Sequence, residues 1–106
     1  MEADSLPNSI EPMKASLAEI PSVSDGWATE IKWDGVRAIS FCEDGELRLQ
    51  GRRLNDITGL FPEIGPLGRQ AAAEGTVLDG EMVAFDEDGI PSFQRIQKRL
   101  RQDGER

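Results

Sequence analysis

Residues 30–37, with the sequence EIKWDGVR, gather an amine, two carboxylates and a guanidinium in one short segment. Because side chains alternate along an extended chain, Glu30, Lys32 and Asp34 are expected to project from the same face of a strand. Asp34 and the glycine after it offer a tight turn, and a strand-like run follows. A lysine near such a strand end has charged neighbours and can reach a ligand, which makes it a candidate nucleophile.

Three segments in order resemble the covalent nucleotidyltransferases, the superfamily of ATP-dependent DNA ligases, RNA ligases and mRNA capping guanylyltransferases. KWDGVR at 32–37 fits the KxDGxR signature of this superfamily. GRRLNDIT at 51–58 is similar to the following motif of bacterial ATP-dependent DNA ligases involved in break repair, although that family usually has serine where this chain has Gly51. VLDGEMVAFD at 77–86 resembles the LDGE motif. The resemblance therefore favours a bacterial ATP-dependent DNA ligase.

The resemblance implies a role for each charged residue of the first motif. Lys32 would accept AMP from ATP and form lysyl-AMP, and Glu30 would accept a hydrogen bond from the adenine amino group. Arg37 would bind the ribose and the nick phosphate, tasks that suit a guanidinium fork. Asp34 would order metal-bound water. A lysine amine attacks only when it is unprotonated, and Arg37 or a bound metal would favour that form.

The other two motifs complete the expected site. Glu81 resembles the family's ribose- or metal-proximal glutamate, and the resemblance implies that Asp34 and Glu81 each approach the metal through water. Arg52 resembles the arginine that contacts the 5′-phosphate flanking the nick, whereas Arg53 has no matching role. The implied cofactors are ATP and Mg²⁺ or Mn²⁺. Each of these side chains also has a simpler interpretation, as a solvated charge or a member of a surface ion pair.

The similarity runs from about residue 9 to residue 100, which implies the front part of an adenylation domain. The family's adenine-stacking aromatic segment, later metal-binding glutamate, distal lysines and OB-fold domain would be its missing partners, and nicked duplex DNA its substrate. The 106-residue chain alone is therefore expected to form little lysyl-AMP and to seal no nicks. Two alternatives stay open, an RNA ligase or capping-type enzyme, and a non-catalytic truncated fragment that only binds a partner.

Composition sets limits on the possible functions. The chain has 12 Lys and Arg against 20 Asp and Glu, and the net charge of −8 opposes general attraction to DNA. It contains no histidine, which excludes imidazole catalysis, and with a single cysteine, Cys42, a zinc site is improbable. Cys42 cannot form an internal disulfide, and neither a signal peptide nor a membrane span of about 20 apolar residues is visible. A cytoplasmic location is the expectation.

The pattern along the chain predicts an α+β fold with a mainly antiparallel sheet and short helices, as expected of a partial nucleotidyltransferase domain of the ATP-grasp-like ligase adenylation type. Residues 1–25 are expected to form an irregular, proline-containing arm with one helical turn at 13–18, and residues 26–106 the incomplete adenylation domain. The predicted strands are 27–33, 36–42, 46–50 and 76–86, with a hairpin turn at 43–45. Helical spacing covers 61–73, with a break at 65–66, and a second helix follows Ser92.

Several side chains are assigned to the core or to the surface. Trp33 is expected to pack in the core, as are Phe93 and Ile96 on the last helix. Asp79 and Glu81 alternate with apolar residues, so both carboxylates should share the sheet face opposite the core. The opposite side of the last helix is basic, and solvation is its simplest interpretation: this side carries Arg95, Lys98, Arg99 and Arg101.

Overall fold

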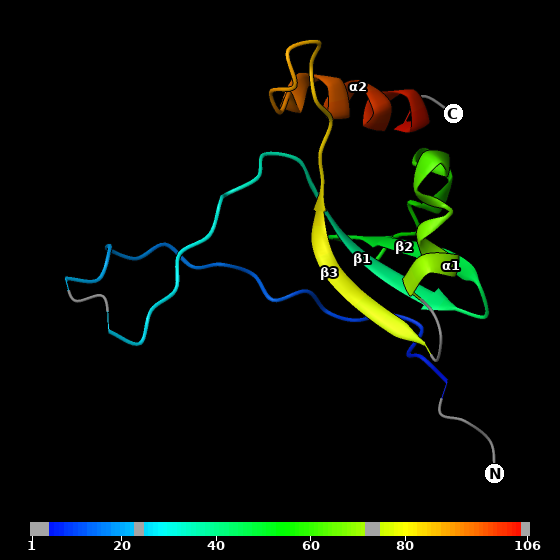
Figure 1. Ribbon diagram of the computed structural model, residues 1–106, viewed down its shortest axis with the longest axis horizontal. Coiled ribbons are helices and arrows are strands. Elements are labelled where there is room, and N and C mark those ends of the chain that lie inside the picture. Colours follow the sequence, from blue (N-terminus) through cyan, green and yellow to red (C-terminus); the bar gives the residue numbers. More distant parts are fainter. Residues whose placement is uncertain (1–4, 23–24, 72–74, 105–106) are drawn as a thin grey trace.

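A three-stranded antiparallel sheet lies at the centre of the computed structural model, which describes residues 5–22, 25–71 and 75–104 (Figure 1). Its strands are β1 (Val36–Glu43), β2 (Glu46–Gly51) and β3 (Thr76–Met82), in the order β2-β1-β3. Short helices accompany the sheet, so the predicted α+β class with an antiparallel sheet is confirmed.

The turn between β1 and β2 is a two-residue hairpin loop. Glu43 pairs with Glu46, and both central residues have positive φ, 54° at Asp44 and 78° at Gly45. Positive φ at both positions is characteristic of the type I′ turn, whose twist matches that of the flanking strands. The hairpin predicted at 43–45 is confirmed, and its glycine is required by the backbone conformation.

Helical elements lie against one face of the sheet: the 3₁₀ helices η1 (Thr58–Leu60) and η2 (Pro62–Ile64) and the α-helix α1 (Leu67–Ala71). The α-helix α2 (Phe93–Gly104) lies beyond the end of the sheet and contacts η1 (Figure 1). The predicted helical interruption at 65–66 is confirmed. The core lies between this layer and the sheet, and its buried members are Ala38, Leu49, Ile57, Phe61 and Ile96. Among the described residues, none of the helices is long and apolar enough to cross a membrane.

Arg99 departs from the predicted solvated basic face of α2. Its guanidinium donates to the carbonyl of Leu60 at 2.8 Å and to both carboxylate oxygens of Glu63 at 2.9 and 3.1 Å. The same group lies 5.7 Å from the centre of the Phe61 ring. This arginine therefore fastens α2 to the η1 and η2 segments, close to the core position of Ile96.

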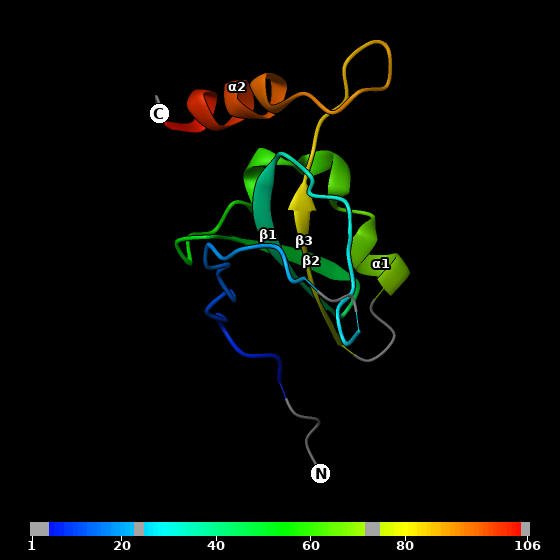
Figure 2. The ribbon, with the colours of Figure 1, turned by 90° about the vertical axis from the view of Figure 1, so that its left-hand side faces the viewer.

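The N-terminal arm, residues 5–13, lies against the other face of the sheet. Along its path the backbone N–H of Leu6 donates to Glu43 at 3.1 Å, and Arg48 donates to the carbonyls of Asn8 and Pro7. The sheet residues Ile39 and Phe41 on this face are both only 3% exposed. Beyond Met13 the chain swings away from the sheet and returns to β1, as Figure 2 shows together with Figure 1.

Two predicted elements are wrong. Residues 27–33 form no strand, and residues 13–18 form no helical turn. Residues 27–33 pair with neither outer strand of the described sheet, and without such a neighbour an extended segment cannot satisfy its backbone as a strand does. Residues 13–18 lie in the segment that leaves the sheet, where a single helical turn lacks the packing needed to offset its nucleation cost.

Candidate nucleotide-binding site

A hollow of about 740 Å³ lies where the segment before β1 approaches the β1–β3 pair. Its lining comes from three parts of the chain: residues 30–33, Arg37 on β1, and residues 79–81 on β3. Arg37 and Glu81 are directly opposite each other in the β1–β3 register, so their side chains share one face of the sheet. Four predicted site residues therefore surround the same hollow: Glu30, Lys32, Arg37 and Glu81.

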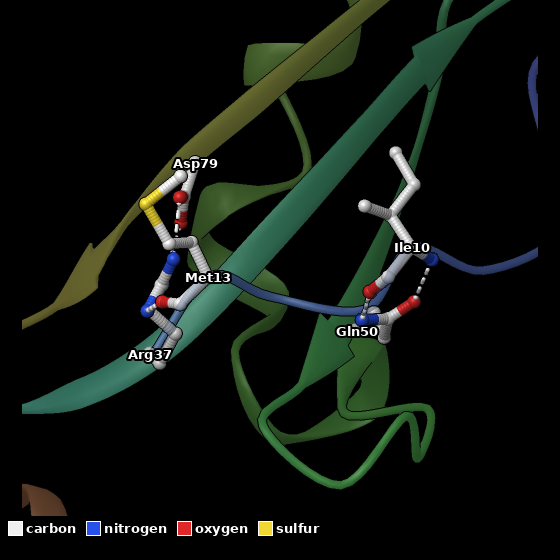
Figure 3. Close-up of polar contacts among 5 residues, drawn as sticks. All are labelled: Ile10, Met13, Arg37, Gln50 and Asp79. Carbon is white, nitrogen blue, oxygen red and sulfur yellow. Dashed lines mark hydrogen bonds and ion pairs between the residues drawn. The ribbon is translucent and has the colours of Figure 1, made fainter. Parts of the chain in front are cut away.

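Arg37 is held by two different segments (Figure 3). Its Nε and Nη2 atoms each donate to one carboxylate oxygen of Asp79 at 2.6 Å, and its Nη1 donates to the carbonyl oxygen of Met13 at 2.7 Å. The hydrogen bonds from the guanidinium hold the pKa of the Asp79 carboxyl below its usual range, while hydrogen bonding to Asp79 raises the pKa of Arg37. Both groups are thus kept ionised.

Asp79 is a lining residue to which the sequence motifs assign no functional role. The alternation in the LDGE motif correctly places Asp79 and Glu81 on the sheet face away from Met82, which packs against the core. The contact between Asp79 and Arg37 depends on the register of β1 against β3, which no local pattern fixes. The signal that could have indicated Asp79 is its place two positions before Glu81, on the same face of the predicted strand.

Lys32 lies in the irregular segment before β1 and is exposed. Its neighbour Trp33 was predicted to be a core residue, and this is wrong because 43% of it is exposed. Instead, Trp33 lines the hollow and meets Phe85 edge to face, with ring centroids 6.5 Å apart. This aromatic contact joins the lysine segment to the loop that follows β3.

Gly35 of the KxDGxR motif is required for packing and not for a left-handed turn, because it is absent from the glycines with positive φ. A Cβ atom at this position would overlap the carbonyl oxygen of Met82 and lie 2.9 Å from Cγ1 of Val83. The glycine therefore lets the chain pass close to the end of β3. Asp34, just before it, is exposed and does not line the hollow.

Arg52 lies outside this hollow. It lines a second one, of about 470 Å³, together with Glu11, Lys14, Arg53 and Leu54. The loop that carries Arg52 is closed by hydrogen bonds from the N–H of Gly51 to Asn55 and from the N–H of Leu54 to Gly51, at 2.8 and 3.0 Å. A Cβ atom at Gly51 would lie 2.8 Å from Asn55 Oδ1, the end of a side chain that can shift to make room for the serine of the resembling family.

The carboxylates that line the hollow could hold a metal ion only together with a bound ligand. Within the part of the chain that the structure describes, no group of three or more acidic or cysteine side chains could hold a metal by itself. Asp79 is paired with Arg37, which leaves Glu30 and Glu81 as the other carboxylates of the lining. Magnesium is commonly bound by one or two carboxylates together with substrate phosphates, and this donor set suits that arrangement.

Comparison with known proteins identifies relatives of this chain. It is similar to the multifunctional non-homologous end joining protein LigD of Mycolicibacterium smegmatis, with 38% identity over 96 residues. The corresponding protein of Pseudomonas aeruginosa is 40% identical over 92 residues. These alignments cover 90% and 87% of this chain but 13% and 11% of the relatives, so the chain spans about an eighth of their length.

The same relationship appears in three dimensions. The solved structure of mycobacterial DNA ligase D complexed with ATP and MES aligns with a TM-score of 0.61 and 38% identity, over 66% of this chain and 23% of that one. The ligase domain of M. tuberculosis LigD aligns with a TM-score of 0.60. In addition, the family described as ATP dependent DNA ligase domain matches residues 8–105. This match spans nearly all of the sequence, and the chain therefore belongs to the ATP-dependent DNA ligase domain family.

Proposed function

We propose that this chain is the nucleophile-bearing part of a bacterial ATP-dependent DNA ligase adenylation domain, and that Lys32 accepts AMP. The observation that carries this proposal is the convergence of Lys32, Arg37 and Glu81, from three separate segments, around one hollow. An amine, a fixed cation and a carboxylate are the groups that nucleotidyl transfer to an enzyme requires. Membership of the DNA ligase domain family supports the same reaction.

In this proposal the Nζ atom of Lys32 attacks the α-phosphorus of ATP. A nitrogen–phosphorus bond forms, the bond from the α-phosphorus to the bridging oxygen breaks, and pyrophosphate leaves with that electron pair. Arg37 stabilises negative charge at the nucleotide, Glu30 accepts from the adenine amino group, and Glu81 lies near the ribose. The complete enzyme would then pass AMP to the 5′-phosphate of a nick, and attack by the 3′-hydroxyl would seal the strand and release AMP.

A divalent ion, Mg²⁺ or Mn²⁺, would enter with the ATP phosphates and neutralise part of their charge. Glu81 is the predicted metal-proximal residue that lines the hollow, whereas the predicted role of Asp34 requires it to act through water from outside the lining. Binding of ATP and the metal therefore rests mainly on Glu30, Arg37 and Glu81 in this chain. A cytoplasmic location belongs to the same proposal.

DNA would be contacted away from the nucleotide hollow. Arg52 shares the second hollow with Lys14 and Arg53, and three cations together favour a phosphate backbone despite the negative net charge of the chain. Nicked duplex DNA is the proposed substrate, and the rest of an adenylation domain and an OB-fold domain are the proposed partners. An RNA ligase, a capping enzyme or a non-catalytic fragment is not favoured, because the matching family is described as ATP dependent DNA ligase domain and the similar mycobacterial structure is named DNA ligase D.

The proposal can be tested in a graft in which residues 8–105 replace the matching segment of the M. tuberculosis LigD ligase domain. We expect the graft to become labelled by ATP carrying a radioactive α-phosphate and to seal nicked DNA. Lys32→Ala should abolish both activities, whereas the control Lys98→Ala should retain them. Full labelling of the Lys32→Ala graft would refute the role assigned to this lysine.

A further inference from the structure

We propose that Asp79 and Gln50 are positioning residues for nucleotide transfer, and that they act by fixing the guanidinium of Arg37 from two sides. Asp79 does so directly, and Gln50 does so by fixing the N-terminal arm at Ile10, three residues before the carbonyl of Met13. This inference rests on the proposed function, because it assigns to Arg37 a contact with the nucleotide or the nick phosphate.

The donor arrangement at Arg37 supports the first half of the inference. An arginine has five N–H groups. Three of them are used by Asp79 and Met13, so among the described residues one on Nη1 and one on Nη2 have no partner. Two neighbouring N–H groups of a guanidinium match the paired oxygens of a phosphate or of ribose hydroxyls. Asp79 and Met13 thus fix the orientation of Arg37 without using all of its donors.

Gln50 supplies the anchor for the arm. Its Oε1 accepts from the backbone N–H of Ile10 at 2.9 Å, and its Nε2 donates to the carbonyl of the same residue at 2.8 Å (Figure 3). Gln50 is 2% exposed and lies on the sheet face that the arm covers. A buried amide that loses both partners pays a desolvation cost, so this pair of bonds specifies where Ile10 lies.

Fixing Ile10 also limits where Met13 can lie. Only Glu11 and Pro12 lie between them, and the ring of the buried Pro12 restricts the backbone. The Met13 carbonyl is therefore presented to Arg37 by a short, anchored segment, although the arm beyond Met13 swings away from the sheet. Without the two contacts the long side chain of Arg37 would sample many rotamers. Because positioning supplies much of the catalysis of phosphoryl transfer, that loss of order would slow the reaction.

The test uses the variants Asp79→Asn and Gln50→Leu, with Glu63→Gln as a matched control. The control breaks the Glu63–Arg99 ion pair, which has similar exposure but lies outside the lining of the nucleotide hollow. In the 106-residue chain, NMR should show that hydrogen exchange of the Arg37 guanidinium protons accelerates in Asp79→Asn and Gln50→Leu and is unchanged in the control. The remaining amide spectrum reports whether each variant is folded.

In the grafted ligase domain, the rate of Lys32 labelling at saturating ATP should fall on the order of 10²-fold in Asp79→Asn, as expected when a fixed group is misplaced. Gln50→Leu should lower the rate in the same direction. The decisive comparison is made in an Arg37→Ala background, where neither substitution should cause a further loss, because positioning acts only through Arg37. A merely structural role would give additive losses instead.

Three results would overturn the inference. The first is labelling of Asp79→Asn at the rate of the control. The second is a loss of rate that persists in the Arg37→Ala background. The third is faster labelling of Asp79→Asn, which would mean that Asp79 competes with the nucleotide for Arg37. If the unsubstituted graft is not labelled at Lys32, the proposed function itself fails. A labelled graft that is indifferent to Asp79 and Gln50 rejects only the positioning roles.

Discussion

Arg37 is the residue at which three segments of the chain converge. β1 carries it, β3 supplies Asp79, and the N-terminal arm supplies the carbonyl of Met13. The KxDGxR motif predicts a functional arginine at this position, but it predicts neither contact. Motif spacing identifies residue types, whereas the partners of Arg37 are set by strand register and by the path of the arm, which depend on long-range packing.

A pH titration should reveal the Arg37–Asp79 pair. Because hydrogen bonds from Arg37 lower the pKa of Asp79 in the folded chain, the pair stabilises the fold above the unfolded carboxyl pKa of about 3.9. That stabilisation, about 1 kcal/mol or less for a partly exposed pair, is lost as the pH falls through the lower folded pKa.

Arg37→Ala should therefore raise the pKa of Asp79 toward its ordinary value, measured by NMR of the carboxyl carbon. Glu63 is the internal control, because its pKa is lowered chiefly by its hydrogen bond with Arg99 and should not respond. An Asp79 titration that is identical in the two proteins would contradict the ion pair in solution.

Among the elements, the β1–β2 hairpin follows from the local sequence, whereas the strand predicted at 27–33 does not form. The hairpin is encoded locally, since Asp44 and Gly45 can both adopt positive φ. Residues 27–33 show the same alternation of apolar and charged side chains as a strand, but alternation forms a strand only beside a partner with a free edge. Here residues 27–33 pair with neither outer strand of the described sheet, and Trp27 and Ile31 stay 66% and 68% exposed.

The contact between Gly35 and the end of β3 predicts a sharp substitution effect. Gly35→Ala would force the new methyl group against the Met82 carbonyl, and we expect a loss of about 1–3 kcal/mol in the free energy of unfolding, as for other overpacked sites. Denaturant unfolding of the 106-residue chain measures this loss.

Gly59→Ala is the matched control, because a Cβ atom at Gly59 meets nothing within 4 Å. Gly35→Ala should also slow Lys32 labelling in the graft, since Lys32 lies three residues away. Equal stability of the two alanine variants would show that the close approach of Gly35 to β3 does not exist in solution.

At the scale of the whole molecule, the sheet is covered on one face by helices and on the other by the arm, but apolar side chains remain exposed around the nucleotide hollow and the loop after β3. The large exposed side chains of these two regions are Ile31, Trp33, Phe85 and Ile90. β2 and β3 are the outer strands of the sheet, and outer strands can pair with another copy.

We therefore expect the isolated 106-residue chain to self-associate, with a sedimentation coefficient that rises with concentration in the micromolar to millimolar range. Replacing Ile31 and Phe85 by serine should reduce this association, whereas a matched change at Leu17, in the segment after the arm that swings away from the sheet, should reduce it less. A monomer at every concentration would show that the exposed apolar side chains do not drive contacts between copies.

The central claim is that Lys32 accepts AMP, and it can be tested by locating the adduct. The chain contains three lysines, at positions 14, 32 and 98; Lys14 lines the second hollow and Lys98 lies on α2. The graft should be incubated with ATP and magnesium, digested, and analysed by mass spectrometry. We predict AMP on the peptide that contains Lys32 and on no other lysine of residues 8–105. An adduct on Lys14 or Lys98, with Lys32 unmodified, would contradict the account.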